Sequence, residues 1–177
     1  MDIKYDIDPM FQIEFFKIRC IDFKNKKKKL EEALARYPEM PRDNFCSNRD
    51  KCSINTEFKQ IFKDEFSLIR AKYNSKISLQ RVWSVSYNKG DYHVPHNHSS
   101  IGYCGILYLD MKPESPRTTY IQPWNNEQDR SVLYTPSVKS GDMVIVPQFL
   151  MHYSAPNPIK FKKRILSFDF IIEPVLF

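Results

Sequence analysis

From Ser78 onward the chain is a succession of short β-type segments, and this pattern restricts the possible fold more than any other feature. The segments are rich in β-branched and aromatic residues, and Gly, Pro, Asn and Asp separate them. They read LQRVWSVSY, IGYCGILYLD, RTTYIQ, SVLYTP, GDMVIVP, MHYSAP and RILSFDFII. So many short strands in the second half of one chain predict a β-barrel or a two-sheet jelly roll.

The first part of the chain has a different periodicity. FQIEFFKIR alternates as a strand does, and DNFCSNRDKCS predicts a polar loop. KKLEEALARYPEMP predicts a helix that ends at Tyr37, because Pro38 disfavours helix in the residue before it. INTEFKQIFKDEFSLIRAKYN has apolar residues at helical spacing and predicts one long amphipathic helix, which Asn55 or Thr56 would cap.

We expect these helices to pack on one sheet of the barrel, which gives an α+β fold. Residues 1–177 would then form a single domain. In it, residues 1–78 supply an N-terminal strand and supporting helices, and residues 79–177 form the β core. The chain is long enough for one domain with a substantial core.

The composition predicts a soluble, cytoplasmic protein. No stretch approaches the roughly 20 apolar residues of a membrane span. The N-terminus, MDIKYDIDPMF, lacks the basic start and apolar middle of a secretory signal. The cysteines are thinly spread, which predicts free thiols in a reducing compartment; they are Cys20, Cys46, Cys52 and Cys104.

Much of the net charge of +6 lies in the run KNKKKKLEE. Nucleic-acid-binding segments typically interleave aromatic residues or Gly-rich loops with their basic residues. This lysine run has neither. We therefore interpret Lys26 to Lys29 as the solvated start of a helix and do not expect a nucleic-acid partner.

The four histidines are distributed unevenly: His93, His96 and His98 lie in GDYHVPHNHSS, and His152 follows a later strand-like run. Side chains at i and i+2 of a strand project from the same face, so His96 and His98 can bind one ion if the segment is extended. Barrel closure would bring His152 beside them, and imidazole suits Fe, Zn, Cu and Ni. His93 would point elsewhere, at the mouth of this predicted metal site.

Three stretches of the chain resemble the core of the Fe(II)/2-oxoglutarate-dependent oxygenases. They are VWSVSYNKGDYHVPHNHSSIGYCGILYLD, SGDMVIVPQFLMHYSAP and KKRILSFDF, within residues 79–172. The resemblance is closest to a branch of small oxygenases in which a His-x-His stretch precedes a Gly-x-x-Tyr strand. It implies a double-stranded β-helix, the jelly-roll barrel that cupins share, with Fe(II) as metal and 2-oxoglutarate as cosubstrate. The implied reaction is hydroxylation of an amino acid, a peptide or a small metabolite.

The family pattern is His-x-Asp/Glu, a distant His, and an Arg about ten residues beyond it. By this resemblance, His96 is the first ligand, His152 is the distal ligand, and His98 stands at the carboxylate position. A neutral ligand there leaves the site one charge unit more positive with Fe(II). The alternatives are that His98 does not bind the metal or that Asp91 contributes the carboxylate instead.

The resemblance also implies which residues hold the cosubstrate. Arg164 lies 12 residues after His152, where the family places the cation that pairs with the C5 carboxylate. A guanidinium offers two parallel hydrogen bonds to that group. The hydroxyls of Tyr108 and Tyr120 are placed to bind the same carboxylate. Four further aromatic residues either shape a pocket or pack in the core; they are Trp83, Tyr87, Tyr92 and Trp124.

Two other functions remain open from the sequence. GDYHVPHNH and GDMVIVPQFLMH also satisfy cupin spacings, although the cupin glutamate is missing after His98. Three histidines without a carboxylate resemble the iron site of thiol dioxygenases. A non-catalytic β-barrel that binds a partner is the third possibility. The position of Arg164 and the strand GYCGILYLD favour the 2-oxoglutarate hypothesis.

Overall fold

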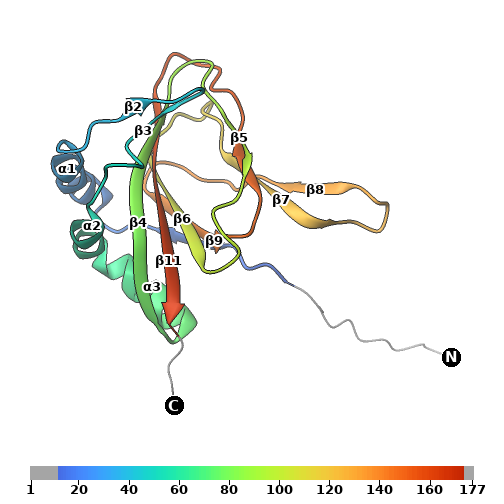
Figure 1. The fold of residues 1–177 in the computed structure, drawn as a ribbon, viewed down its shortest axis with the longest axis horizontal. Helices are drawn as coiled ribbons and strands as arrows, with labels where there is room; N and C mark the ends of the chain where they lie inside the picture. Colours follow the sequence, from blue (N-terminus) through green and yellow to red (C-terminus); the bar gives the residue numbers. More distant parts are fainter. Residues whose placement is uncertain (1–11, 174–177) are drawn as a thin grey trace.

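The computed structural model describes residues 12–173, which contain two antiparallel sheets and three helices (Figure 1). The strands of the larger sheet are β1 (Phe16–Arg19), β2 (Met40–Pro41), β3 (Cys46–Ser47), β4 (Lys76–Tyr87), β6 (Tyr103–Asp110), β9 (Asp142–Pro147) and β11 (Lys163–Glu173). The strands of the smaller sheet are β5 (His93–His96), β7 (Thr118–Asn125), β8 (Ser131–Tyr134) and β10 (His152–Ser154). The helices are α1 (Phe23–Leu34), α2 (Asn55–Ile61) and α3 (Lys63–Tyr73).

The path of the chain alternates between the two sheets. The larger sheet has the order β1-β9-β6-β11-β4-β3-β2, and the smaller has the order β5-β10-β7-β8. From β4 onward the chain crosses between sheets at almost every connection, and only β7 and β8 are successive strands of one sheet. Each β-type segment predicted after Ser78 coincides with a strand of the structure.

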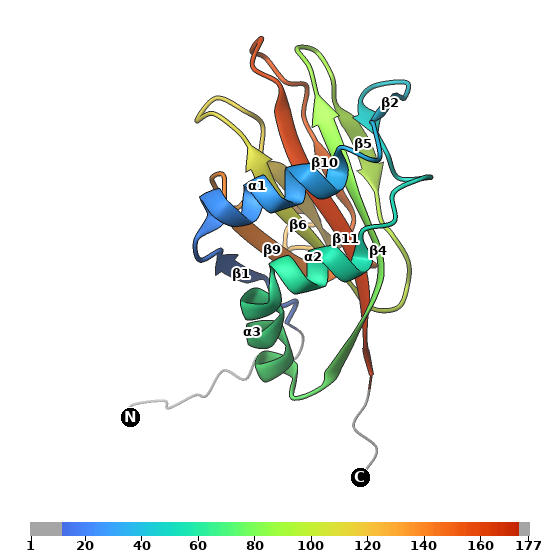
Figure 2. The same ribbon diagram turned by 90° about the vertical axis from the view of Figure 1, so that its left-hand side faces the viewer.

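The larger sheet is buried on both faces. Toward the helices, Leu166, Phe168 and Phe170 of β11 share one apolar cluster with residues of α1, α2 and α3. Figure 2 shows the helices lying across this face. Toward the smaller sheet, Ile165 belongs to a second cluster with Val85 and other interior residues. Because alternate residues of a strand point to opposite faces, the register of β11 decides which side chains lie between the sheets.

The helices differ from the sequence prediction at their ends and in one break. The predicted long helix is two helices, because the chain turns at Phe62 with φ −104° and ψ 30°. The buried Phe62 ring lies 5.0 Å from the Phe58 ring, between centroids. Ile54 precedes α2 without a side-chain cap, so neither Asn55 nor Thr56 has the predicted capping role. Helix α1 ends at Leu34, before Tyr37.

The lysine run is less solvated than predicted. Lys26 pairs with the buried carboxylate of Glu65 at 2.7 Å and with Asp64 at 3.1 Å. Lys27 pairs with Asp110 of β6 at 2.5 Å. These two lysines therefore fasten α1 to neighbouring elements.

Two other predictions concern the N-terminal part. The predicted polar loop contains the short strand β3, and the predicted N-terminal strand is shorter, since β1 begins at Phe16; Phe11, where the prediction began, lies outside the described residues. All four cysteines are free thiols, as predicted.

None of the helices in residues 12–173 is long and apolar enough to cross a membrane.

Candidate metal centre

The predicted histidine trio comes together at the end of the smaller sheet. His96 is the last residue of β5, His152 is the first of β10, and the two are register partners. One ring nitrogen from each of His96, His98 and His152 lies within 4.8 Å of the others. The ring centroids of His96 and His152 are 4.5 Å apart, and those of His98 and His152 are 5.2 Å apart.

Each of these three rings is held by its Nδ1 atom. His96 Nδ1 lies 2.8 Å from the Val94 carbonyl oxygen, and His152 Nδ1 lies 2.9 Å from the Leu150 carbonyl oxygen. His98 Nδ1 lies 2.5 Å from a carboxylate oxygen of Asp169. An Nδ1–H that donates to an oxygen leaves Nε2 as a free acceptor, which is the usual arrangement of a metal-binding histidine.

Asp169 supplies a carboxylate to this site. It contacts the ring of His98 and is not one of the three candidate ligands itself. Its side chain is buried on β11, 71 residues from His98 in the sequence. A carboxylate behind a histidine orients the ring and raises its basicity. Asp169 thus places a negative charge beside the trio, so the greater positive charge expected for a three-histidine site is offset. Asp91 is not in the trio, because it accepts hydrogen bonds from Asn88.

The geometry that brings His98 to the trio differs from the prediction. Strand β5 ends at His96, so His98 does not continue it as the i+2 residue of an extended strand. The backbone N–H of His98 donates to the Gln148 carbonyl at 3.0 Å, and its ring lies 5.4 Å from the Trp83 ring. His93 does not point away either, since its ring stacks on His96 at 3.9 Å.

Burial favours the neutral form of three of these imidazoles, those of His93, His96 and His152. It lowers the pKa of His152 to about 3, with a further contribution from His96. Burial also lowers the pKa of His93 to about 3 and lowers that of His96. A metal ligand must be deprotonated, and a neutral imidazole needs no proton loss before it binds. The three imidazoles of the trio are donors that suit Fe, Zn, Cu or Ni.

Arg164 does not point between the sheets, contrary to the position that the family resemblance implied. Its guanidinium makes two hydrogen bonds to the carboxylate of Glu31 on α1, at 2.7 and 2.9 Å. A third contact reaches Asp110 at 3.4 Å. Arg164 shares the helix-facing side of β11 with Leu166, so the strand register directs it away from the histidines.

Lys163, the residue before it, is the cation that lies between the sheets. Its side chain is fully buried, and its Nζ donates to the Ser154 hydroxyl of β10 at 2.8 Å. The Nζ atom also lies 4.6 Å from the centre of the Tyr87 ring. Among residues 12–173, no carboxylate forms an ion pair with it. Burial lowers the pKa of Lys163 to about 7.

Two tyrosine hydroxyls of the inter-sheet cluster lack partners. The hydroxyls of Tyr108 and Tyr120 are buried and have no hydrogen-bond partner in the described part of the chain. Both rings belong to the apolar cluster between the sheets, together with Tyr87. Tyr120 is the register partner of His152. A buried hydroxyl without a partner costs free energy, which a bound polar ligand can offset.

The cavity at the histidines is small. Its volume is about 30 Å³, and its lining includes Trp83, Tyr87 and His93 as predicted, together with the trio. Tyr92 does not line it. Trp124 lies apart, in a groove of about 390 Å³ along the β7–β8 hairpin, where 46% of its surface is exposed.

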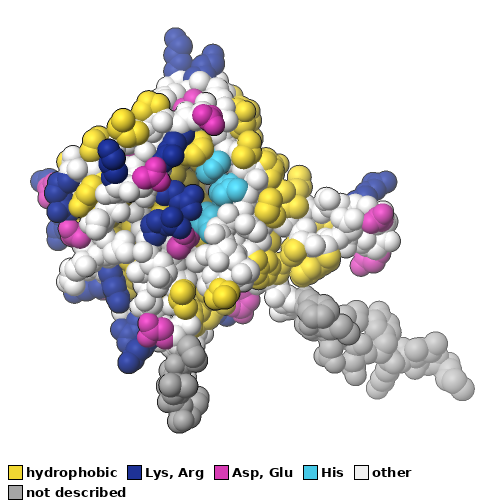
Figure 3. Space-filling model, in the orientation of Figure 1, with side chains coloured by type: hydrophobic (Ala, Val, Ile, Leu, Met, Phe, Trp, Pro, Cys, Tyr) yellow, Lys and Arg dark blue, Asp and Glu magenta, His cyan; other side chains and the backbone are white. Residues whose placement is uncertain are grey.

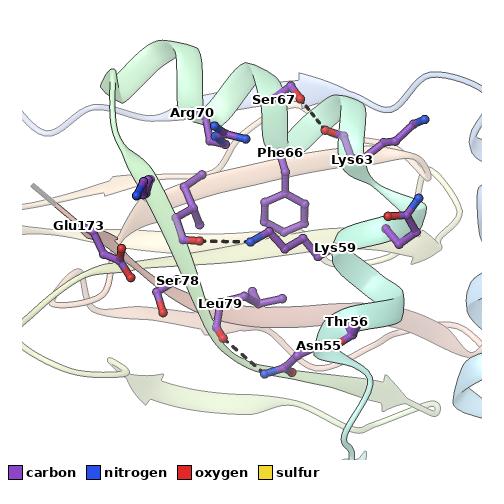
Figure 4. Close-up of a pocket in the computed structure, with 13 residues that line it drawn as sticks. Asn55, Thr56, Lys59, Lys63, Phe66, Ser67, Arg70, Ser78, Leu79 and Glu173 are labelled. Atoms are coloured by element: carbon purple, nitrogen blue, oxygen red, sulfur yellow. Dashed lines mark hydrogen bonds between the residues drawn. The ribbon is translucent and has the colours of Figure 1, made fainter. Parts of the chain in front are cut away.

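A larger cavity of about 810 Å³ lies elsewhere, between α2, α3 and the first residues of β4 (Figure 4). In Figure 4, Lys59 reaches across it and donates to the Ile77 carbonyl at 3.4 Å. Its lining is basic and contains no histidine or cysteine. The chemistry-bearing side chains therefore gather at the smaller cavity.

Known proteins of similar structure share this architecture. A 2OG-Fe(II) oxygenase family oxidoreductase from Burkholderia pseudomallei matches with a TM-score of 0.64 and 9% identity, over 89% of this chain and 84% of that one. HygX from Streptomyces hygroscopicus matches with a TM-score of 0.64 and 14% identity, over 88% and 82%. The epimerase SnoN from nogalamycin biosynthesis matches with a TM-score of 0.65 and 11% identity, over 89% and 77%.

This chain has the fold of the Fe(II)/2-oxoglutarate-dependent oxygenases. No protein-family model matches its sequence, and no curated protein matches it. The similarity to these oxygenases therefore rests on the structural matches.

Sequence reasoning missed two residues of this oxygenase-fold site, Lys163 and Asp169. Both lie on the face of β11 that also carries Ser167, opposite the apolar residues Leu166 and Phe168. The alternation of polar and apolar residues in KRILSFDF was a signal for this face. It would have assigned the interior cation to Lys163 and left Arg164 on the opposite side.

Proposed function

We propose that this protein is an Fe(II)- and 2-oxoglutarate-dependent dioxygenase that hydroxylates a small molecule or a peptide. One observation carries the proposal: three histidines, each held through Nδ1, line a cavity together with Ser154. The Ser154 hydroxyl in turn accepts a hydrogen bond from a buried lysine that no carboxylate of residues 12–173 neutralises. The first feature suits a divalent metal, and the second suits an organic anion.

We also propose that β4 to β11 form a double-stranded β-helix, with the helices outside the larger sheet and with residues 1–177 as one domain. Two observations support this. The strands β9-β6-β11-β4 lie side by side in one sheet and β5-β10-β7-β8 in the other, so the chain passes from one sheet to the other at nearly every connection. Phe58 of α2 and Phe66 of α3 contact Phe168 of β11, with ring centroids 5.1 and 5.9 Å apart, so helices and sheet share a core.

His96, His98 and His152 would hold the Fe(II) through their Nε2 atoms. Asp169 would fix the ring orientation of His98 and balance the metal charge. Bound Fe(II), with 2-oxoglutarate and O2, supplies the oxidising chemistry. The protein binds and orients the reactants and excludes water from them.

Lys163 would bind the C5 carboxylate of 2-oxoglutarate, assisted by the Ser154 hydroxyl. The unpartnered hydroxyls of Tyr108 and Tyr120 are donors for the same anion. The present cavity holds about one water molecule, so these side chains must move apart when the cosubstrate enters. Tyr87 and Trp83 then form walls that keep water from the metal.

Similar structures support the choice of metal and cosubstrate. HygX was crystallised with nickel, 2-oxoglutarate and hygromycin B, and SnoN with Fe3+, α-ketoglutarate and nogalamycin RO. SnoN is an epimerase, so this fold serves oxidative outcomes other than hydroxylation. We propose hydroxylation because it is the reaction that the sequence resemblance implies.

The test is release of succinate from 2-oxoglutarate. Purified protein with Fe(II), ascorbate and O2 should form succinate slowly without substrate and faster with a suitable substrate. Chelation of the metal and His152→Ala should both abolish it. Absence of succinate from iron-loaded protein across a broad substrate set would contradict the proposal.

A three-histidine thiol dioxygenase is the second candidate. The observation that favours it is the ligand set itself, because no carboxylate belongs to the trio of His96, His98 and His152. Such an enzyme would convert a thiol to a sulfinate with O2 and without 2-oxoglutarate. Iron-dependent O2 consumption with thiols alone would favour it over the oxygenase. Metal binding without either reaction would favour the non-catalytic module.

A further inference from the structure

A second pocket opens on the outer side of the histidines. Its volume is about 240 Å³, and His93, His96, His98 and Trp83 line both this pocket and the inner cavity. Three arginines complete its lining, namely Arg42, Arg49 and Arg81, together with Phe45, Ser47 and Asp50. Figure 3 shows histidine side chains at the surface beside a group of Lys and Arg side chains.

Arg49 is the least satisfied of these arginines. Within residues 12–173, its guanidinium forms no ion pair and donates no hydrogen bond. It lies 5.1 Å from the centre of the Trp83 ring, and the guanidinium of Arg81 lies 5.3 Å from the same ring. Burial and the charge of Arg81 both lower the pKa of Arg49. Two guanidinium groups thus lie within 5.3 Å of the centre of one indole ring.

The acidic groups nearby are already engaged. Asp50 pairs with Arg42. Asp169 divides its oxygens between His98, at 2.5 Å, and Arg81, at 3.3 Å. The pocket therefore has more positive than negative charge before any metal binds, and a divalent metal would increase the excess.

We propose that this arginine pocket binds the carboxylate or phosphate group of a small anionic substrate. The inference rests on the proposed function, since it assigns a substrate class to that site. A planar guanidinium binds either group through parallel hydrogen bonds, and one anion between Arg49 and Arg81 would relieve their mutual repulsion. Trp83 and Phe45 offer faces for the adjoining carbon skeleton.

The position of the pocket determines how a bound substrate would be oriented relative to the histidines. The cosubstrate site at Lys163 lies between the sheets, whereas Arg49 and Arg81 lie on the outer side of the same histidines. An anion held by the two arginines would leave the next few atoms of the substrate facing His96 and His98. This arrangement keeps substrate and cosubstrate anions in separate sites.

Calorimetry with phenyl phosphate and benzoate tests this inference, with phenol as the uncharged control. The full chain is titrated twice, once metal-free and once loaded with Ni(II) and 2-oxoglutarate, which occupies its own anion site. We expect one bound phenyl phosphate or benzoate per chain in both samples and no binding of phenol; the stronger anion identifies the group preferred. Arg49→Gln should weaken binding about tenfold or more, and Arg49→Lys should weaken it less.

Arg36→Gln is the matched control, because Arg36 is an exposed arginine that pairs with Glu57 away from the pocket. It should leave anion binding unchanged, and Arg49→Gln should leave the affinity for 2-oxoglutarate unchanged. Equal anion affinity in wild type and Arg49→Gln, or no anion binding by wild type, would overturn the inference. Loss of 2-oxoglutarate binding in Arg49→Gln would also overturn it, because the arginines would then hold the cosubstrate. Anion binding that depends on Arg49 in a protein that binds no 2-oxoglutarate would refute the proposed function alone.

Discussion

Replacing Lys163 by Met removes a buried charge that we assign to the cosubstrate carboxylate. A charge-assisted hydrogen bond contributes about 1.5–3 kcal/mol, so the dissociation constant for 2-oxoglutarate should rise roughly 10- to 150-fold. Metal affinity should change little, because Lys163 contacts Ser154 and Tyr87 and not the histidine trio. Without cosubstrate, the variant should be at least as stable as wild type, because an unpaired buried ammonium is costly.

The neighbouring residue supplies the matched control. Arg164→Met removes the two hydrogen bonds to Glu31 on α1 and should lower the melting temperature. It should leave 2-oxoglutarate binding unchanged, because Arg164 faces the helices. Calorimetric titration of the Ni(II)-loaded variants measures both affinities. If Arg164→Met loses the cosubstrate while Lys163→Met retains it, the assignment of the interior cation is wrong.

The pKa of Lys163 adds a pH dependence with a defined sign. Burial lowers this pKa from 10.5 to about 7, so the unliganded side chain is neutral above pH 7. A bound carboxylate favours the ammonium, so binding above pH 7 takes up a proton and weakens by up to about tenfold per pH unit. The unliganded folded state, by contrast, gains stability between about pH 7 and 10.5, where the unfolded chain still binds this proton. Calorimetry in buffers of different ionisation enthalpy measures the proton uptake, and Lys163→Met should abolish it.

Two further substitutions test the metal site and the core. Asp169→Asn should weaken Ni(II) binding by about 10- to 100-fold by removing the carboxylate behind His98, whereas Asp110→Asn should not; equal affinities would exclude the role of Asp169. Gly105→Ala would place a Cβ 2.0 Å from an atom of the Phe168 ring and should lower the free energy of unfolding by about 1–3 kcal/mol or more in urea titrations. Adding Phe168→Leu should recover part of that loss, and a neutral Gly105→Ala variant would contradict the packing described.

The strands and the pairing of His96 with His98 could be predicted because both depend on local signals, whereas the approach of His152 followed from the predicted barrel. Strand segments alternate in polarity and end at Gly, Pro, Asn or Asp, and these properties are independent of the rest of the fold. His96 and His98 are two residues apart, so any path of the chain keeps them close. The prediction of one long helix failed at Phe62, where the backbone leaves helical geometry although Phe58, Phe62 and Phe66 keep the spacing of one helix face.

The orientation of Arg164 was not predicted because a one-residue difference in register exchanges the two faces of a strand. Lys163 and Arg164 are equally plausible from spacing alone, and only the pairing of β11 with β4 and β6 separates them. Asp169 and Arg49 depend on contacts between distant segments. Nothing local to His98 indicates that a carboxylate 71 residues away will support its ring.

The most direct test of the account is an anaerobic calorimetric titration of Fe(II), followed by 2-oxoglutarate, into the wild-type chain and two histidine variants. The account predicts one Fe(II) per wild-type chain, and 2-oxoglutarate binding that is much tighter once iron is present. His96→Ala and His152→Ala should lose stoichiometric iron and, with it, this tight binding. Retention of one equivalent of iron by both variants would contradict the central claim that these histidines form the metal centre of an oxygenase.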